Sequence, residues 1–405
     1  MNNQPIINLK SGRVFGNELK YLQEVLSTEF RSSMGSGFMR RLEDSFAQRF
    51  HSPYAISFVN GTATMHAALE AWGIGPGDEV IVPPLTMSAT TFVVLQAGAT
   101  PVFADIDPKT FQIDAASIAT RVTPRTKAII TVALYGLSPD MDSIMAVARR
   151  HGIRVLEDNA QCFLGTYKGK IAGTLGDCAS FSFQSSKHIT SGEGGMVITA
   201  DLELAEAIRK VQSLGYAGVS ATKGKITKRD IQDPAYSRHV TMGWNYRMPE
   251  LCCAVALAQL ENIDVLVDRR VKAAGAFEAV AKSCDWLVPQ EIPKDCTSSY
   301  WTWVARIDRD DVSWHQFRDR FLELGGDGVY AAWKLTYLEP MFQNMNLLRR
   351  ERFISDSMKA TYRPGLCPVA ESIQPRLLQF KTNYWQEEQA HKQAEILAKT
   401  ILSFN

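Results

Sequence analysis

One lysine is the side chain in this sequence that is best placed for covalent chemistry. Lys187 follows an apolar, alternating run, Cys178 to Phe183, and precedes a turn built from three glycines around Glu193. A lysine at a strand end can be partly desolvated, which lowers the pKa of its amine and makes the neutral nucleophile available. Because an isolated loop lysine is usually just solvated, the hypothesis depends on its companions.

A carboxylate 29 residues before Lys187 is the first companion. Asp158 ends another apolar run, in Glu157-Asp158-Asn159-Ala160-Gln161. There it could pair with a protonated ring nitrogen, as an electron-sink cofactor such as pyridoxal phosphate requires. Taken alone, Asp158 is better interpreted as a cap of the next turn or helix.

Two polar segments could hold a phosphate. Asn60-Gly61-Thr62-Ala63-Thr64 opens a predicted helix, whose free N–H groups and dipole attract anions, although the same residues also make an ordinary turn and cap. Ser182, Ser185 and Ser186 could supply hydroxyl donors beside Lys187.

The elements that must position these residues alternate between two hydrophobic periods. This alternation favours a largely parallel sheet covered by helices on both faces. The expected helices are Thr62 to Trp72, Ala89 to Ala97, Asp114 to Val122 and Met141 to His151, and the expected strands are Glu79 to Val82, Thr100 to Ala104, Lys127 to Val132, Arg154 to Glu157 and Cys178 to Phe183. Ligands bind such sheets at the carboxyl ends of the strands, so Asp158 and Lys187 are expected to meet in one site.

The flanking regions have weaker patterns. Helical periodicity from Leu19 to Phe50 is interrupted at Ser32 to Gly37, and Ser220 to His239 is expected to be an exposed excursion. A single long helix from Pro249 to about Val280 is expected to join two domains.

The last part of the chain mixes both kinds of element. From Trp286 on, strand-like Tyr300 to Ile307 alternates with amphipathic helices, Trp314 to Leu324 and Gln386 to Leu402. We predict a large domain over residues 15–260 and a smaller α+β domain over residues 261–405, with residues 1–14 packing nearby.

Composition excludes several classes of protein. The 405 residues are 45% hydrophobic, and 44 basic against 43 acidic residues give a formal charge of +1, which argues against nucleic acid or anionic membrane as a partner. We find no signal peptide and no run of about 18 apolar residues, so a cytoplasmic protein is expected. The seven cysteines lack the spacing of a zinc site, and no metal is expected.

Seven segments in this order resemble one enzyme family. They are NGTATMHAAL, GIGPGDEVIVPPLT, PVFADIDP, ALYGLSPDMD, HGIRVLEDNAQ, FSFQSSKHITSGEGG and WNYRMPE. Together they are similar to the DegT/DnrJ/EryC1/StrS family of sugar aminotransferases, over about Phe15 to Gln259 and more loosely to the end. The resemblance implies an α/β fold like that of aspartate aminotransferase (pyridoxal-phosphate fold type I) and pyridoxal 5'-phosphate as cofactor.

Roles follow from this resemblance by position. Lys187 would bond covalently to the cofactor and later move a proton between cofactor and substrate carbons. Asp158 would pair with the pyridine nitrogen, and Gln161 would lie against the 3′-oxygen. Residues from three further segments would hold the phosphate: Gly61, Thr62, Ser182 and, from a partner subunit, Asn245. The last role implies a homodimer with shared active sites.

The sequence departs from the family pattern at two positions. Met87 occupies the place where an aromatic side chain commonly stacks on the cofactor, and a thioether can also cover a ring. Ala133 replaces a frequent histidine, so a substrate contact there is lost or replaced. Some relatives carry histidine in place of the lysine and catalyse dehydration, but the spacing to Gly192 puts Lys187, not His188, in register.

The predicted reaction transfers an amino group from glutamate to a sugar carbonyl. The resemblance leaves open a nucleotide-linked keto-hexose, a keto-cyclitol or an oxidised sugar acid such as an 8-oxo octulosonate, for a surface polysaccharide or a natural product. The segments Asp327 to Pro340 and Leu366 to Tyr384 favour a free sugar or cyclitol by pattern alone. Alternatives are a sugar dehydratase and a non-catalytic regulatory descendant of the fold. Weak candidates for anion contacts are Arg229, Arg238, Lys334 and Lys381.

Overall fold

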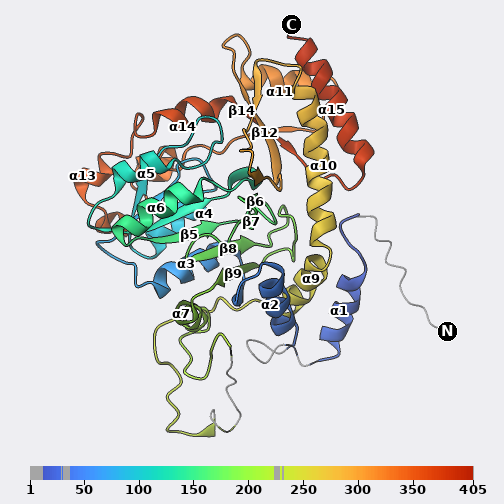
Figure 1. Cartoon of the computed structure of the whole chain (residues 1–405). Helices are drawn as coiled ribbons and strands as arrows, with labels where there is room; N and C mark the ends of the chain where they lie inside the picture. The colour runs from blue at the N-terminus through green and yellow to red at the C-terminus, as the bar shows by residue number, and fades with distance from the viewer. Residues whose placement is uncertain (1–11, 29, 31–36, 223–228, 230–231, 405) are drawn as a thin grey trace, which may run out of the picture.

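A seven-stranded sheet forms the centre of the computed structural model, which describes residues 12–28, 30, 37–222, 229 and 232–404 (Figure 1). The strand order is β1-β9-β8-β5-β4-β2-β3, and six strands run in one direction while β9 runs against both of its neighbours. The strands are β1 (Tyr54–Phe58), β2 (Glu79–Val82), β3 (Thr100–Phe103), β4 (Thr126–Val132), β5 (Arg154–Asp158), β8 (Cys178–Ser182) and β9 (Gly195–Thr199).

Helices cover both faces of this sheet, because its strands are apolar on both sides. In β2, Val80 and Val82 pack into one core, whereas Ile81 packs into another on the opposite face. One face carries α3 (Gly61–Ala71), α4 (Ala89–Gln96) and α7 (Leu202–Gln212); the other carries α5 (Ala115–Arg121) and α6 (Met141–His151) and, over β8 and β9, α1 (Asn17–Leu26), α2 (Gly37–Arg49) and α9 (Glu250–Leu260) (Figure 1).

A second, antiparallel sheet lies beside the first. Its order is β10-β12-β14-β13, and α10 (Ile263–Ala281), α11 (Trp314–Glu323) and α15 (Glu387–Leu402) pack against it. The strands are β10 (Leu287–Pro289), β12 (Thr302–Ile307), β13 (Val329–Ala331) and β14 (Leu377–Lys381). A small third sheet joins β11 (Cys296–Thr297), β6 (Thr166–Tyr167) and β7 (Lys170–Ile171).

The segment between β13 and β14 returns to the large sheet. It contains α12 (Pro340–Gln343), α13 (Asp356–Lys359) and α14 (Pro368–Ile373), of which Figure 1 shows α13 and α14 near α5. Tyr362 packs against Phe103 and donates a hydrogen bond to the carbonyl of Pro101 (2.6 Å). This later segment shares the core of the first sheet. The predicted division into two domains at residue 260 stays a prediction.

The expected elements of the large sheet are present within one or two residues of their predicted bounds, with two corrections. The predicted long helix from Pro249 to about Val280 is wrong: it is two helices, α9 and α10, separated at Glu261 and Asn262. Leu260 and Ile263 continue the apolar pattern across the break, so periodicity could not reveal it. Glu261 instead accepts hydrogen bonds from Asn17 (2.7 Å) and Tyr21 (2.6 Å) of α1.

The second correction concerns β1 and β9, which were not predicted. Both strands are short and fully or nearly buried, so their hydrophobic pattern has little periodic signal. In addition, β9 leads directly out of a glycine turn. Residues 32–36 of the expected joint, and parts of the expected excursion at residues 220–239, lie outside the described residues.

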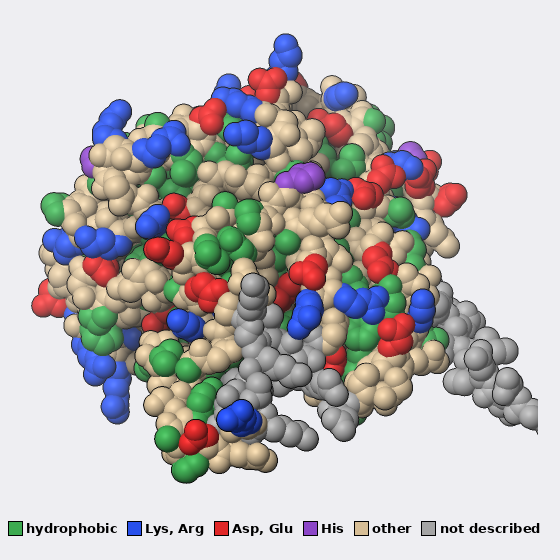
Figure 2. Space-filling view, turned by 60° about the horizontal axis from the view of Figure 1, so that its bottom comes forward, with side chains coloured by type: hydrophobic (Ala, Val, Ile, Leu, Met, Phe, Trp, Pro, Cys, Tyr) green, Lys and Arg blue, Asp and Glu red, His purple; other side chains and the backbone are tan. Residues whose placement is uncertain are grey.

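The surface agrees with the near-zero net charge. Lys and Arg side chains are interspersed with Asp and Glu over the face shown in Figure 2. Among the described residues, no helix is both long and apolar enough to cross a membrane.

Candidate active site

A cavity of about 330 Å³ at the carboxyl ends of the central strands brings the predicted residues together. We call it the Lys187 pocket. Its lining includes Asn60, Gly61, Thr62, Met65, Thr86, Met87, Ala89, Val132, Asp158, Ala160, Gln161, Ser182, Gln184, Ser186, Lys187, Glu193, Trp301 and Trp333. Seven of the eight residues predicted to bind the cofactor are in this set, as expected for strand ends that meet at one edge of a sheet.

The turn after β8 presents Lys187 in a fixed geometry. The amide of Lys187 donates to the carbonyl of Gln184 (2.9 Å), and the Gln184 side chain accepts from the backbone (2.8 Å) and hydroxyl (2.7 Å) of Ser186. The turn is thus closed by its own polar groups, and Ser186 uses its hydroxyl for the turn. Ser185 does not line the pocket.

Two arginines bind the outside of the same turn. The buried guanidinium of Arg270, on α10, donates to the carbonyls of Ser186 (2.9 Å) and Lys187 (3.2 Å), and Arg13 donates to those of Ser185 and Lys187. Arg270 also bonds the Trp301 carbonyl (2.7 Å). The acceptors named here are neutral carbonyls, and the positive charge of Arg270 acts to lower the pKa of Lys187.

The amine of Lys187 has a strongly shifted pKa. Burial is the largest cause and lowers the pKa from 10.5 to about 8; Asp158 opposes this shift, Arg270 adds to it, and Glu193 opposes it. A substantial fraction of the amine is therefore neutral near physiological pH, which a nucleophile or general base requires.

Asp158 ends β5 and is buried, with 5% of its surface exposed. It accepts hydrogen bonds from the Thr90 hydroxyl (2.9 Å) and the Ala160 amide (3.1 Å). Burial raises its pKa, while these two hydrogen bonds and the charge of Lys187 lower it. A buried carboxylate of this kind is stabilised by a cationic group placed against it.

The other end of the pocket is formed by the start of α3 and the end of β8. Asn60 caps α3 by accepting from the Ala63 amide (2.8 Å), and Gly61 and Thr62 line the pocket. A Cβ on Gly61 would lie 2.8 Å from the Cβ of Ser182, so only glycine permits this close approach. Helix amides and hydroxyls in this arrangement suit a phosphate.

Gln161 and Met87 complete the predicted set within the chain. Gln161 is buried, and its Oε1 accepts from the Tyr135 amide (2.8 Å), which leaves its amide N–H groups for the pocket. Met87 lines the pocket with 52% of its surface exposed. Ala133 is buried at the end of β4, outside the lining, and His188 points away: its Nε2 donates to the Ser299 carbonyl (2.9 Å).

Asn245 is the predicted residue that this chain does not bring to its own pocket. It is exposed and lies in a segment that pairs with Ser213, so its expected role in a partner's site stays a prediction. The four candidate anion contacts also lie outside the lining: Lys381 forms an ion pair with Asp327 (2.6 Å), and Lys334, Arg229 and Arg238 are exposed.

Two tryptophans of the pocket were missed from the sequence. Trp301 lies just before β12, and Trp333 follows β13. Each is more than 110 residues from Lys187, and neither belongs to a motif with a chemical meaning of its own. Trp333 opens the segment that returns onto the large sheet, whereas Trp301 precedes β12 and bonds the turn of Lys187 directly through the Ser186 carbonyl (3.0 Å).

The lining fits pyridoxal phosphate in its donor set. Asp158 provides a buried carboxylate for a protonated ring nitrogen, the Gly61 and Ser182 end provides phosphate donors, and Lys187 lines the same cavity. No other basic side chain lines this pocket among the described residues.

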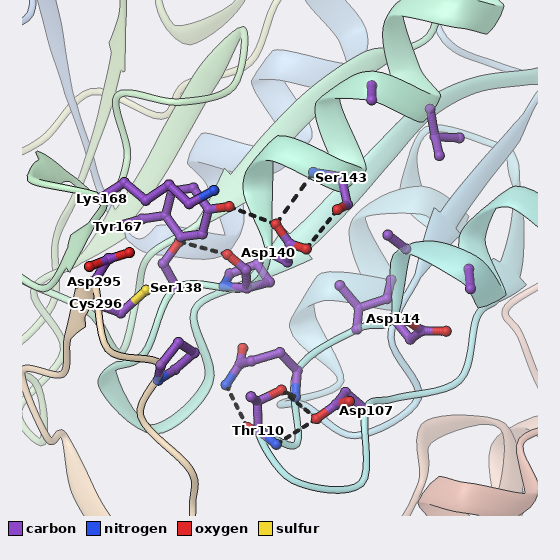
Figure 3. Close-up of a pocket in the computed structure, with 18 of the residues that line it drawn as sticks. Asp107, Thr110, Asp114, Ser138, Asp140, Ser143, Tyr167, Lys168, Asp295 and Cys296 are labelled. Atoms are coloured by element: carbon purple, nitrogen blue, oxygen red, sulfur yellow. Dashed lines mark hydrogen bonds between the residues drawn. The ribbon is translucent and has the colours of Figure 1, made fainter.

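A larger hollow lies elsewhere on the molecule (Figure 3). It measures about 780 Å³ and opens between α5, α6, β6 and the segment before β11. We call it the Asp140 groove; its polar lining includes Asp107, Thr110, Asp114, Asp140, Ser143, Arg150, Tyr167, Lys168 and Asp295. Figure 3 shows Asp140 accepting hydrogen bonds from Ser143 and Tyr167, so its carboxylate is used within the protein.

Comparison with known proteins gives the same picture over most of the chain. The model of the DegT/DnrJ/EryC1/StrS aminotransferase family matches residues 15–376. A GDP-perosamine synthase of Caulobacter vibrioides is 44% identical over 308 residues, which are 76% of this chain and 79% of that protein.

Two further comparisons extend the likeness. A UDP-2-acetamido-2-deoxy-3-oxo-D-glucuronate aminotransferase of Pseudomonas aeruginosa is 40% identical over 66% of this chain and 70% of its own length. The solved structure of an aminotransferase from Psychrobacter cryohalolentis superposes with a TM-score of 0.83 at 28% identity, over 96% of this chain and 97% of that one. The predicted fold and family are confirmed: the chain belongs to the DegT/DnrJ/EryC1/StrS family and is a sugar aminotransferase that depends on pyridoxal phosphate.

Proposed function

We propose that this enzyme transfers an amino group from glutamate to a ketone or aldehyde carbon of a sugar. The observation that carries the proposal is the pairing of Lys187, whose pKa is about 8, with the buried Asp158 in one pocket. A nucleotide-linked keto sugar is the first acceptor to test, because two similar proteins carry the names of enzymes for nucleotide-linked sugars. The expectation of a free sugar or cyclitol stays a prediction.

The chain's own residues would divide the work as follows. Pyridoxal phosphate, when bound, supplies an electron sink for a carbon that carries an amine. Asp158 would hold the proton on the ring nitrogen, and Gly61, Thr62 and Ser182 would hold the phosphate. The neutral amine of Lys187 acts as nucleophile and then moves the proton from the amine-bearing carbon. Since donor and acceptor use the same pocket in turn, ping-pong kinetics are expected.

The absorption spectrum with pyridoxal phosphate is the direct test. A visible band should form with the wild-type protein, and glutamate should bleach it; GDP-perosamine, an amino sugar, should bleach it in the same way by the reverse reaction. A band that glutamate leaves unchanged contradicts the donor or the reaction, and favours the dehydratase alternative. Without any band, the non-catalytic alternative is favoured.

A second copy of the chain would complete the pocket. Glutamate brings two carboxylates, yet Lys187 is the one basic side chain that lines the pocket among the described residues. The side chain of Asn245 is exposed, while its neighbours Trp244 and Tyr246 are partly buried and hold this segment against the core. We therefore keep the homodimer with shared sites as part of the proposal.

Hybrid dimers test the sharing. Lys187→Ala and Asn245→Ala homodimers should each be impaired. If Asn245 serves the partner's site, a mixture refolded or coexpressed at equal amounts should regain about a quarter of wild-type activity, because half of the dimers carry one intact site in two. Activity that stays at the level of the separate variants would show that Asn245 and Lys187 do not meet across an interface.

A further inference from the structure

We propose that Trp301 and Trp333 form an aromatic wall that binds the flat C–H face of the acceptor's pyranose or cyclitol ring beside Lys187. This inference rests on the proposed function, since it names the part of the acceptor that the same site recognises. It makes the neutral ring, and not a base or a phosphate, the group that selects the substrate at this wall.

The two indoles stack on each other at the Lys187 pocket, with the Lys187 amine over the ring of Trp301. Their ring centroids are 5.9 Å apart with planes inclined by 27°, and both line the cavity. The amine of Lys187 lies 4.8 Å from the ring centroid of Trp301. A ring that rests on this wall is therefore within one side chain's reach of the nucleophile.

The wall is held in place before any ligand arrives. The indole Nε1 of Trp301 donates to the Ser186 carbonyl (3.0 Å), and its own carbonyl accepts from Arg270 (2.7 Å) and Thr382 (3.0 Å). Gly136 lets the backbone pass so closely that a Cβ there would lie 3.0 Å from the Trp301 amide. A rigid aromatic surface binds a ligand with little further loss of conformational entropy.

Trp333 is attached less tightly and is the better residue to vary. Its neighbour Ala332 is buried, with its carbonyl bonded by Gln374 (3.0 Å), so the backbone is fixed while the indole stays partly exposed. In the described part of the chain, its Nε1 has no protein acceptor, which leaves this donor for a sugar hydroxyl.

The rest of the lining suits a polyhydroxylated ring. A sugar or cyclitol ring has hydrogen-bonding hydroxyls at its edge and apolar C–H groups on its faces. The carboxylate of Glu193 lines the same cavity and can bond such an edge, whereas the amide of Gln184 is used within the turn. Among the residues that the structure describes, the pocket offers an anionic group no basic side chain other than Lys187 itself.

Saturation-transfer NMR on the cofactor-loaded enzyme tests the wall through contact and not turnover. The probes are methyl α-D-mannopyranoside, scyllo-inositol and GDP. The ring C–H protons of the first two should receive saturation from the wild-type protein. This transfer should be lost in Trp333→Ala and retained in Trp333→Phe, which keeps an aromatic face.

Tyr330→Ala is the matched control, because Tyr330 is an exposed aromatic residue three positions away, outside the pocket. It should leave the transfer unchanged. The proposal is overturned if neither ring probe receives saturation from the wild type, or if the ring probes still receive it from Trp333→Ala. It is also overturned if Trp333→Ala abolishes the transfer to the guanine protons of GDP and leaves the transfer to the ring probes unchanged.

Kinetics give a second readout. Trp333→Ala should raise the KM for the sugar reactant about tenfold more than the KM for glutamate, in line with the loss of an aromatic contact. An equal rise in both constants contradicts the wall. Failure of glutamate to bleach the visible band of the wild-type enzyme would instead contradict the proposed function. The NMR measurement does not depend on that reaction, so it tests the aromatic wall separately.

Discussion

Of the Lys187 pocket and the Asp140 groove, the smaller cavity is the one that we propose as the active site. The groove is more than twice as large, about 780 Å³ against about 330 Å³, and it carries more charged side chains. Its charges, however, are exposed and paired locally, as in the contacts of Asp140 with Tyr167 (2.6 Å) and of Lys168 with Asp142 (2.6 Å). The pocket instead places a lysine and an aspartate where burial is the largest cause of the shifts in their pKa values.

The largest expected effect comes from removing the nucleophile. Lys187→Ala should lower turnover by roughly 10³-fold or more, because a positioned proton-transfer group is lost together with the covalent attachment. Steady-state rates with glutamate and an oxidised sugar measure this. Circular dichroism and the oligomeric state should match the wild type, and full activity in the folded variant would disprove the role of Lys187.

Asp158→Asn should follow, with a loss of about 10²-fold. The amide keeps the shape of the side chain and can accept from Ala160 through its oxygen, while its NH2 group can donate to the Thr90 hydroxyl, but it cannot stabilise a protonated ring nitrogen. The measurement is the rate at which glutamate bleaches the visible band at saturating cofactor. A variant as fast as the wild type would show that this carboxylate does not face the ring.

The charge of Arg270 should set the pH dependence of the pocket. Cofactor binding to the cofactor-free protein needs the neutral amine of Lys187, so its rate should rise with pH through about 8. Arg270→Met removes a charge that lowers this pKa, and the midpoint should move to higher pH, whereas Arg270→Lys should keep it closer to 8. Visible absorbance over a pH series measures both.

The same shift has a consequence for stability with a definite sign. Because the pKa of Lys187 is lower in the folded protein, the unfolded chain binds more protons between about pH 8 and the ordinary value of 10.5. The contribution of Lys187 to the free energy of unfolding therefore rises with pH across that window. If the pH midpoint of cofactor binding is the same in Arg270→Met as in the wild type, the charge of Arg270 does not act on Lys187. The role of Arg270 would then be only to hold the turn in place.

The smallest effect on activity is expected in the groove. Asp140 caps α6 by accepting from Ser143, so Asp140→Ala should lower the free energy of unfolding by about 1 kcal/mol while kcat and KM stay within error. Chemical denaturation and steady-state kinetics separate the two. A large change in KM would mean that the Asp140 groove takes part in substrate binding, as the Lys187 pocket is proposed to do.

The sequence alone was sufficient to predict those features that depend on local hydrophobic pattern and on residue type at strand ends. The alternation of helix and strand predicted the parallel sheet, and the positions of Asp158 and Lys187 at strand ends predicted that they would meet, because parallel strands end at one edge. Gly61, Thr62, Gln161 and Ser182 were found by their place in segments that resemble a family.

The tertiary structure decided what depends on distant parts of the chain. Arg270 and Trp301 lie 83 and 114 residues after Lys187, yet one bonds its carbonyl and the other lies against its amine. The break between α9 and α10 was hidden because apolar residues continue through it. Spacing in sequence determines which side chains share a helix or a strand end, whereas contacts between segments far apart arise only when several elements bury their apolar faces together.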